Sequence, residues 1–161
     1  MNIKLLITGG TIDKVYNELT GRLVFKQTHL IDMLNQSRSM VDTLSEVLFL
    51  KDSLDMSGAD RALILRKCQA SDTSHVLITH GTDTMAKTAK LLGKEINNKT
   101  IVLFGAMMPY SIKSSDALFN LGVALSAVQT KKCGVYIAMN GQVFDFDKVE
   151  KNKGQSIFIS A

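Results

Sequence analysis

Residues 3–13 read IKLLITGGTID, and this stretch decides the fold. A short apolar run, Ile3–Ile7, is followed after one residue by Gly9, Gly10 and Thr11. A near-continuous apolar run of this length is typical of a parallel strand that is buried on both faces of its sheet. Two glycines after such a strand permit a tight loop close to a ligand. We therefore expect a buried strand that ends in a polar loop at the edge of a sheet.

The same pattern continues along the chain, where apolar runs alternate with segments of helical periodicity. The later runs predict strands at residues 47–50, 75–78, 100–104 and 135–139, with a last short strand at 156–159. Helical spacing predicts helices at residues 29–36, 57–69, 84–94 and 115–130. Strands that alternate with helices imply right-handed crossovers. We expect an α/β fold with an open, mostly parallel sheet and helices on both faces (three-layer α/β/α), as a single domain over residues 1–161.

Composition excludes several classes of protein. Of the 161 residues, 45% are hydrophobic and 21% charged, which is typical of a globular domain. The net charge of +4 is spread along the chain, so we expect no nucleic-acid partner. No apolar stretch approaches the roughly 20 residues of a membrane span, so we expect no membrane insertion. Cys68 and Cys133 lie far apart without a CxxC motif, which predicts free thiols, no metal site and a reducing cytoplasmic location.

The polar loop Thr8–Asp13 has two possible chemical uses. Its backbone N–H groups could cradle a phosphate or stabilise an oxyanion. The spacing of a phosphate-binding loop is missing, which disfavours nucleotides. The hydroxyl of Thr11 is either part of a turn or cap, as in most loop threonines, or a nucleophile.

Two further polar loops also follow predicted strands, at the edge where open α/β sheets bind ligands. In Thr79–Thr84, Thr82 or Asp83 could cap the next helix, or the pair could bind a substrate ammonium and share a proton with a base. His80 is interpreted as a structural hydrogen-bonding residue. After the second strand, Ser53 and Asp55 either cap a helix or hold the polar head of a ligand.

Together these loops resemble the bacterial-type L-asparaginase family. The TGGTI and THGTDTM stretches are highly specific, and the other motifs follow in the same order. In chain order the matching motifs are Thr8–Ile12, Asp52–Met56, Ile78–Met85, Gly105–Pro109, Ser115-Asp116, Phe119–Leu121, Gly134-Val135 and Met139-Asn140. The resemblance covers almost the whole chain but only the larger N-terminal domain of the family. We therefore expect the family's small C-terminal domain to be absent.

The resemblance implies an amidohydrolase that needs no cofactor. The family's nucleophile matches Thr11, which would attack the side-chain amide of L-asparagine and form an ester that water hydrolyses to L-aspartate. The family's Thr-Asp-Lys set matches Thr82 and Asp83. Counting along the helix from the FNL motif assigns its lysine to Lys131, with Lys132 as the alternative. Tyr16 matches the tyrosine of a mobile loop that closes over the site.

The resemblance also implies a substrate pocket. Ser53 would hold the substrate's α-carboxylate, and Asp83 would bind its α-ammonium. The remaining pocket residues are expected to be Gly10, Asp55, Gly81, Thr82 and Ala106. In two-domain members an acidic residue of a neighbouring subunit completes the site, so we expect a homo-oligomer. Residues Gln142–Lys153 are a candidate contributor to that contact.

Two other functions stay open at the level of sequence. The chain could be an amidase for another small amide, such as glutamine. It could also bind an amino acid through Ser53 and Asp83 without turnover.

Overall fold

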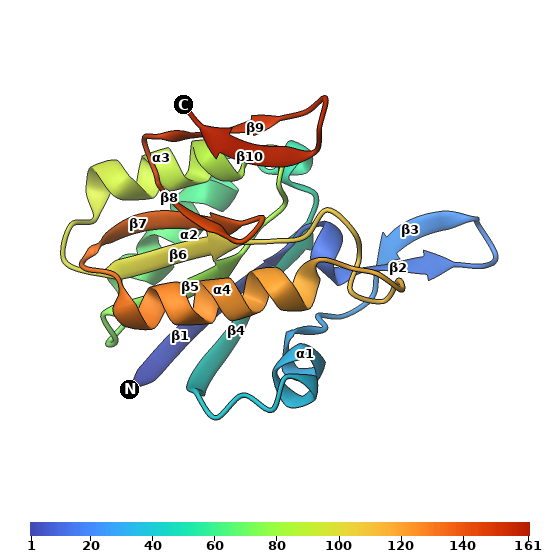
Figure 1. Cartoon of the computed structure of the whole chain (residues 1–161), viewed down its shortest axis with the longest axis horizontal. Helices are drawn as coiled ribbons and strands as arrows, with labels where there is room; N and C mark the ends of the chain where they lie inside the picture. The colour runs from blue at the N-terminus through green and yellow to red at the C-terminus, as the bar shows by residue number, and fades with distance from the viewer.

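The computed structural model describes all 161 residues and contains a six-stranded sheet with the strand order β4-β1-β5-β6-β7-β8 (Figure 1). The first five of these strands are parallel, and β8 pairs antiparallel with β7. The predicted open, mostly parallel sheet is therefore confirmed. The strands are β1 (Asn2–Gly9), β4 (Asp42–Lys51), β5 (His75–Thr79), β6 (Thr100–Phe104), β7 (Gly134–Met139) and β8 (Gln142–Asp145).

The four predicted helices are confirmed within two residues at each end. They are α1 (Leu30–Gln36), α2 (Gly58–Gln69), α3 (Met85–Glu95) and α4 (Ala117–Thr130). Ser57 begins α2 with a capping box: its hydroxyl accepts from the Asp60 N–H while the Asp60 carboxylate accepts from the Ser57 N–H. None of the four helices combines the length and apolar character that a bilayer span requires.

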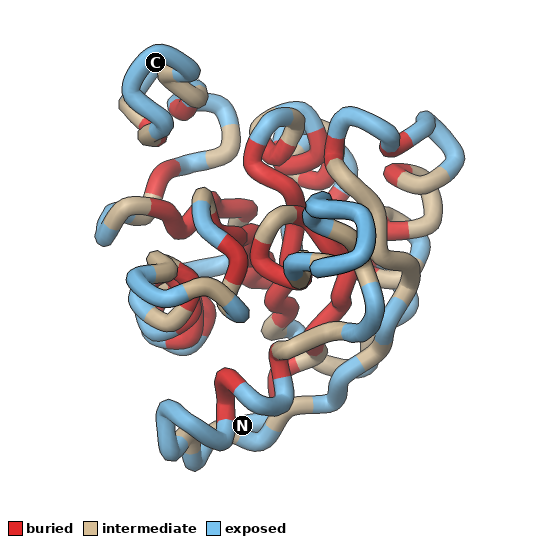
Figure 2. The backbone as a smooth tube through the Cα atoms, turned by 90° about the vertical axis from the view of Figure 1, so that its right-hand side faces the viewer, coloured by how far each residue is buried: buried red, intermediate tan, exposed pale blue.

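The helices cover both faces of the sheet, as predicted for three layers. Alternate residues of β1 point to opposite faces, so Leu5 and Ile7 pack with α1 and α4 while Leu6 packs with α2 and α3. Each face buries its own apolar cluster, and in Figure 2 the buried backbone gathers in the interior beneath exposed loops. Burial on both sides explains why the strand sequences are continuous apolar runs rather than alternating ones.

The strand order changes direction at β1. From β1 the chain first adds β4 on one side, and then returns past β1 to add β5, β6 and β7 on the other. Ligands of open α/β sheets bind at such a switch point, outside the carboxyl ends of the strands. The loops after β1 and β5 therefore flank the expected binding position.

The antiparallel edge strand β8 and two hairpins outside the main sheet were not predicted. The first hairpin consists of β2 (Lys14–Asn17) and β3 (Arg22–Phe25), and it projects beyond the end of the sheet (Figure 1). The second hairpin consists of β9 (Val149–Asn152) and β10 (Ile157–Ser160), of which only the last strand was expected. The sequence does contain a signal for the first hairpin, because Asn17 and Gly21 bracket a turn between two short segments rich in β-branched and aromatic residues.

Candidate functional site

The three polar loops touch one another at the carboxyl edge of the sheet. A side chain at Gly10 would place its Cβ 2.6 Å from the backbone nitrogen of Gly81. A side chain at Gly81 would meet Ser53 at 2.8 Å. Only glycine fits at both positions, so the loops after β1, β4 and β5 are in direct backbone contact. The structure therefore brings together the loops that carry Thr11, Ser53 and Thr82.

Hydrogen bonds hold the first loop against its neighbours. The Gly10 N–H donates to the Lys51 carbonyl at 2.9 Å, and the Thr8 hydroxyl donates to the Thr79 carbonyl at 2.5 Å. Gly9 and Gly10 have φ values of 89° and 86°, a region that favours glycine. Thr11 then begins a short 3-10 turn, Thr11–Asp13, and is partly exposed. Its side chain makes no intramolecular hydrogen bond, which leaves the hydroxyl available.

Lys151 is the lysine that meets Thr82 and Asp83. Its Nζ donates to Thr82 Oγ1 at 2.7 Å and to Asp83 Oδ1 at 2.7 Å. The lysine side chain is only 14% exposed, and that of Asp83 is 33% exposed. Lys151 lies on β9, in the hairpin that the sequence did not predict, which is why it was overlooked. The sequence marked Lys151 only as one of several polar residues in the stretch after β7.

Lys131 does not belong to this cluster, and its assignment there was wrong. It lies just past the end of α4, where its carbonyl accepts a hydrogen bond from Thr100 Oγ1 at 3.4 Å. Thr100 begins β6, so Lys131 is at the amino edge of the sheet, opposite the site. Its ammonium lies over the ring of Tyr136. Lys132 is exposed at the same edge, where its carbonyl accepts from the Tyr136 hydroxyl.

The hairpin that carries Lys151 is fixed by buried contacts. Phe158 on β10 and Val149 on β9 are both 1% exposed and pack into the core that α3 covers. The Phe158 N–H donates to Asn140 Oδ1 at 2.8 Å, and the Asn140 N–H donates to Asn120 Oδ1 at 3.1 Å. Lys151 is therefore held by the core and not by a free tail.

Ser53 is buried and is tied to the start of α3. Its Oγ accepts from the Thr84 N–H at 3.2 Å, and its carbonyl accepts from the Thr84 hydroxyl at 2.8 Å. Ser53 thus anchors Thr84, the residue that precedes α3, from outside the helix. Of the two uses left open for Thr82 and Asp83, capping of α3 is not observed: the hydrogen bonds of their side chains are those with Lys151.

His80 is a buried structural residue, as predicted. Its Nδ1 lies 2.8 Å from the Gly81 carbonyl, which can only accept, so Nδ1 carries the proton. Burial, with a smaller contribution from the Arg61 charge, lowers the pKa of His80 to about 4. The neutral ring therefore accepts at Nε2 from the Thr88 hydroxyl, 2.7 Å away.

The other predicted pocket residues differ in their surroundings. Asp55 is exposed in the 3-10 turn Ser53–Asp55, and its side chain makes no hydrogen bond or ion pair. Ala106 is buried in the loop after β6, next to the turn that Asp116 holds by accepting from the Met107 N–H. No group of three or more His, Cys, Asp or Glu side chains comes together to hold a metal ion.

Tyr16 lies on the β2–β3 hairpin and is 61% exposed. Its hydroxyl makes no hydrogen bond, and a side chain at Gly21 would come within 4.0 Å of it. The structure therefore places the Tyr16 hydroxyl beside the turn of its own hairpin.

The root of this hairpin is anchored on both sides. Asp13 is fully buried, and its Oδ1 accepts from the His29 N–H at 2.8 Å and from Thr28 Oγ1 at 3.1 Å. Burial raises the pKa of Asp13. Lys14 forms an ion pair with Asp52, the residue before Ser53. The hairpin is thus connected directly to the loop of the candidate pocket.

These features define a class: an open α/β domain with hydroxyl, carboxylate and amine groups gathered at the switch point of its sheet. The family model described as "Asparaginase, N-terminal" matches residues 2–158. The chain therefore belongs to the asparaginase family, over the N-terminal domain of that family.

Individual relatives agree with this assignment. The chain is 31% identical to a probable periplasmic L-asparaginase of Haemophilus influenzae, over 97% of this chain and 48% of the relative. It is 31% identical to a glutaminase-asparaginase of Acinetobacter glutaminasificans, over 93% and 49%. The solved thermostable L-asparaginase of Thermococcus kodakarensis superposes with a TM-score of 0.87 at 28% identity, over 99% of this chain and 51% of that one. The chain thus spans about half the length of these relatives.

Proposed function

We propose that the chain hydrolyses the side-chain amide of L-asparagine to L-aspartate and ammonia through an ester on Thr11. One observation carries the proposal: Lys151 forms hydrogen bonds with Thr82 and Asp83, whose loop packs against the Thr11 loop. A threonine hydroxyl is a weak nucleophile and needs a neighbouring group that takes its proton. The cluster supplies an amine and a second hydroxyl for that task.

The proposed reaction has two steps. Thr11 Oγ1 attacks the amide carbon, the C–N bond breaks, and the nitrogen leaves as ammonia after it receives the proton from the hydroxyl. Water then attacks the ester, which releases L-aspartate and restores the Thr11 hydroxyl. In its neutral form Lys151 can accept a proton from Thr82, because the two atoms are already at hydrogen-bonding distance. Backbone N–H groups of the glycine loops would stabilise the oxyanion.

The proposed pocket places Ser53 at the substrate's α-carboxylate and Asp83 at its α-ammonium. Gly10 and Gly81 let the backbone approach the ligand, while Asp55 and Ala106 border the pocket. Tyr16 would act after movement of its hairpin, because its hydroxyl now lies beside Gly21. Such hairpin closure would exclude water until acylation.

An amidase for glutamine is the second candidate. It is favoured by the relative described as a glutaminase-asparaginase. A panel of L-asparagine, L-glutamine and dipeptide amides, followed by ammonia release, separates the two substrates.

We further propose that the chain self-associates and acts in the cytoplasm. The candidate site is open on this chain: none of the surface grooves includes Thr11, Thr82 or Lys151, and one of about 490 Å³ lies along α4 instead. A second subunit would supply the missing wall. Both cysteines are free thiols, which suits a reducing compartment. Light scattering under assay conditions tests the association.

The central test compares ammonia release by the wild type and by Thr11→Val. Valine keeps the shape of threonine and removes the hydroxyl, so the fold should persist while turnover is lost. Undiminished turnover in Thr11→Val would overturn the mechanism. Binding of L-aspartate by calorimetry without turnover in the wild type would instead support the amino-acid-binding alternative.

A further inference from the structure

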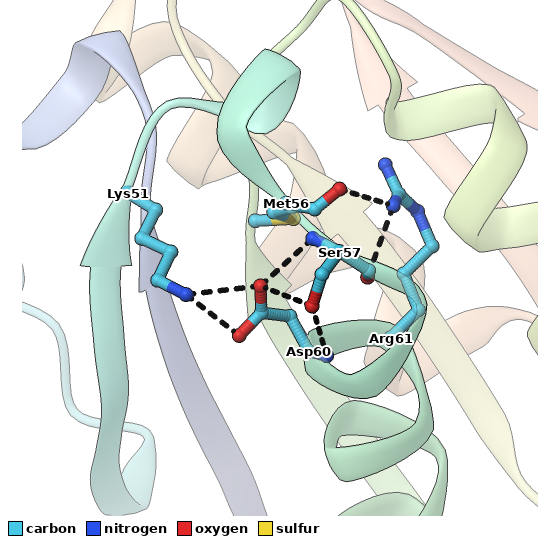
Figure 3. A network of polar contacts seen from close by, with 5 residues as sticks. All are labelled: Lys51, Met56, Ser57, Asp60 and Arg61. Atoms are coloured by element: carbon cyan, nitrogen blue, oxygen red, sulfur yellow. Dashed lines mark hydrogen bonds and ion pairs between the residues drawn. The ribbon is translucent and has the colours of Figure 1, made fainter.

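Arg61 is a buried cation without a carboxylate partner. It is the fourth residue of α2 and is only 6% exposed. The ion pairs of the molecule do not include it: the nearby Asp60 pairs with Lys51 (Figure 3). Burying an unpaired charge is costly unless its donors are satisfied. The donors of Arg61 must therefore find other oxygens in the protein.

The guanidinium instead donates to neutral oxygens of two segments, Met56-Ser57 and Thr84–Thr88. Nη1 donates to the carbonyls of Met56 at 2.8 Å and Ser57 at 3.2 Å (Figure 3). Nη2 donates to the Thr84 hydroxyl at 2.8 Å, and Nε donates to the Thr88 hydroxyl at 3.2 Å. Arg61 thus joins the end of the Ser53 loop to the first two turns of α3.

Both branches of this network end in the candidate site. The Thr84 hydroxyl donates a hydrogen bond to the Ser53 carbonyl, and the Thr84 N–H donates to Ser53 Oγ. On the other branch, the Thr88 hydroxyl donates to His80 Nε2. The Nδ1–H of His80 in turn donates to the Gly81 carbonyl. A single guanidinium therefore organises both the Ser53 loop and the Gly81 loop.

We propose that Arg61 is a positioning residue that orients Ser53 through Thr84 and favours a substrate with an α-carboxylate by its uncompensated positive charge. This inference rests on the proposed function, in which Ser53 binds the α-carboxylate of the substrate. Charge and geometry act together: a cation in a low-dielectric interior attracts an anion at the pocket more strongly than one in water. The charged groups of the Lys151 cluster, Lys151 and Asp83, instead form an ion pair with each other.

The test measures how Arg61 discriminates between two substrates. L-Asparagine carries the α-carboxylate, and 3-aminopropanamide is the same molecule without it. In Arg61→Met, kcat/KM for L-asparagine should fall by at least about tenfold, mainly through KM, because hydrogen bonds of a charged donor are lost. The value for 3-aminopropanamide should change by less than about threefold on the same grounds. Equal loss with both substrates shows a merely structural role and overturns the proposal.

Two matched variants separate charge from packing. Arg66 is exposed on the same helix, so Arg66→Met should leave both substrates unchanged. Arg61→Lys retains the charge and should restore most of the preference for L-asparagine. If Arg61→Met does not fold, as judged by thermal unfolding, the comparison of Arg61→Lys with Arg61→Gln decides between charge and neutral hydrogen bonding. A preference that is the same in these two variants contradicts the charge effect.

An activity-independent measurement distinguishes failure of the proposed function from failure of this inference. Calorimetry compares L-aspartate with β-alanine, which lacks the α-carboxylate, in the wild type, Arg61→Met and Arg66→Met. Loss of L-aspartate affinity only in Arg61→Met supports the inference even if the wild type releases no ammonia. Unchanged L-aspartate affinity in Arg61→Met overturns it.

Discussion

Lys151 Nζ lies 2.7 Å from Thr82 Oγ1, although the two residues are 69 positions apart in the chain. The contact joins the β9–β10 hairpin to the loop after β5, and Asp83 accepts from the same nitrogen. Because Thr82 Oγ1 accepts from Lys151, its own hydrogen is free for a second partner. The proposed transfer of a proton from Thr82 to Lys151 requires this contact.

Replacement of Lys151 should remove the proton acceptor of the proposed reaction. Lys151→Met is expected to lower kcat by about 10²–10⁴-fold, the usual size of a general-base contribution. Lys131→Met is the matched control, since Lys131 lies at the opposite edge of the sheet. Steady-state ammonia release measures both variants. Loss of activity in Lys131→Met with normal activity in Lys151→Met would restore the assignment made from sequence.

Addition of one methyl group at Gly81 should disturb the pocket directly. The new Cβ would lie 2.8 Å from the side chain of Ser53, so one loop must shift. Gly81→Ala is expected to lower kcat/KM by roughly 10–100-fold, since a displacement of about 1 Å in an active site can cost about 100-fold. Gly58→Ala is the control, because nothing lies within 4 Å of that position. Similar kinetics of the two variants would show that the contact is unimportant.

The stability of the fold should fall as the pH decreases from neutral toward about 4. His80 has a folded pKa of about 4 and an ordinary value of 6.5. Between these values the unfolded chain binds the proton and the folded chain does not, so acid favours unfolding. The full effect is about 3 kcal/mol in the free energy of unfolding. Urea titrations at a series of pH values measure it.

The control for this prediction is His80→Gln, which has no ionisable side chain. Its free energy of unfolding should be lower at neutral pH but should lack the part of the pH slope that belongs to His80. An unchanged slope would mean that other groups cause the acid sensitivity. The raised pKa of Asp13 acts in the opposite direction, because burial of its carboxylate favours the protonated form.

The two thiols should differ in reactivity in the native protein. Cys133 is exposed, whereas Cys68 is buried, and burial raises the pKa of Cys68 to about 12. The thiolate is the reactive form, so a thiol reagent should modify one cysteine per native chain. Cys133→Ser should abolish this native labelling, and denaturant should expose Cys68. Rapid native labelling of Cys133→Ser would contradict the buried position of Cys68.

Much of the fold follows from local patterns. The apolar runs predicted the interior strands because residues buried on both faces of a parallel sheet must all be apolar. The polar half of β4, Asp42–Glu46, was missed because an edge strand is only partly buried. The β2–β3 hairpin was missed because it lies outside the core and each of its strands is only four residues long.

The sequence by itself determined the alternation of the five parallel strands with the four helices, the three polar loops and the places of Thr11, Ser53, Thr82 and Asp83 in those loops. These features depend on residue spacing over short distances, which a linear pattern retains. Only the tertiary structure decided which lysine reaches Thr82. That contact depends on how Phe158 and Asn140 dock the β9–β10 hairpin, and the free energy of such docking comes from residues distant in the chain. Lys131 and Lys151 carry the same side chain, and the packing alone places one at each edge of the sheet.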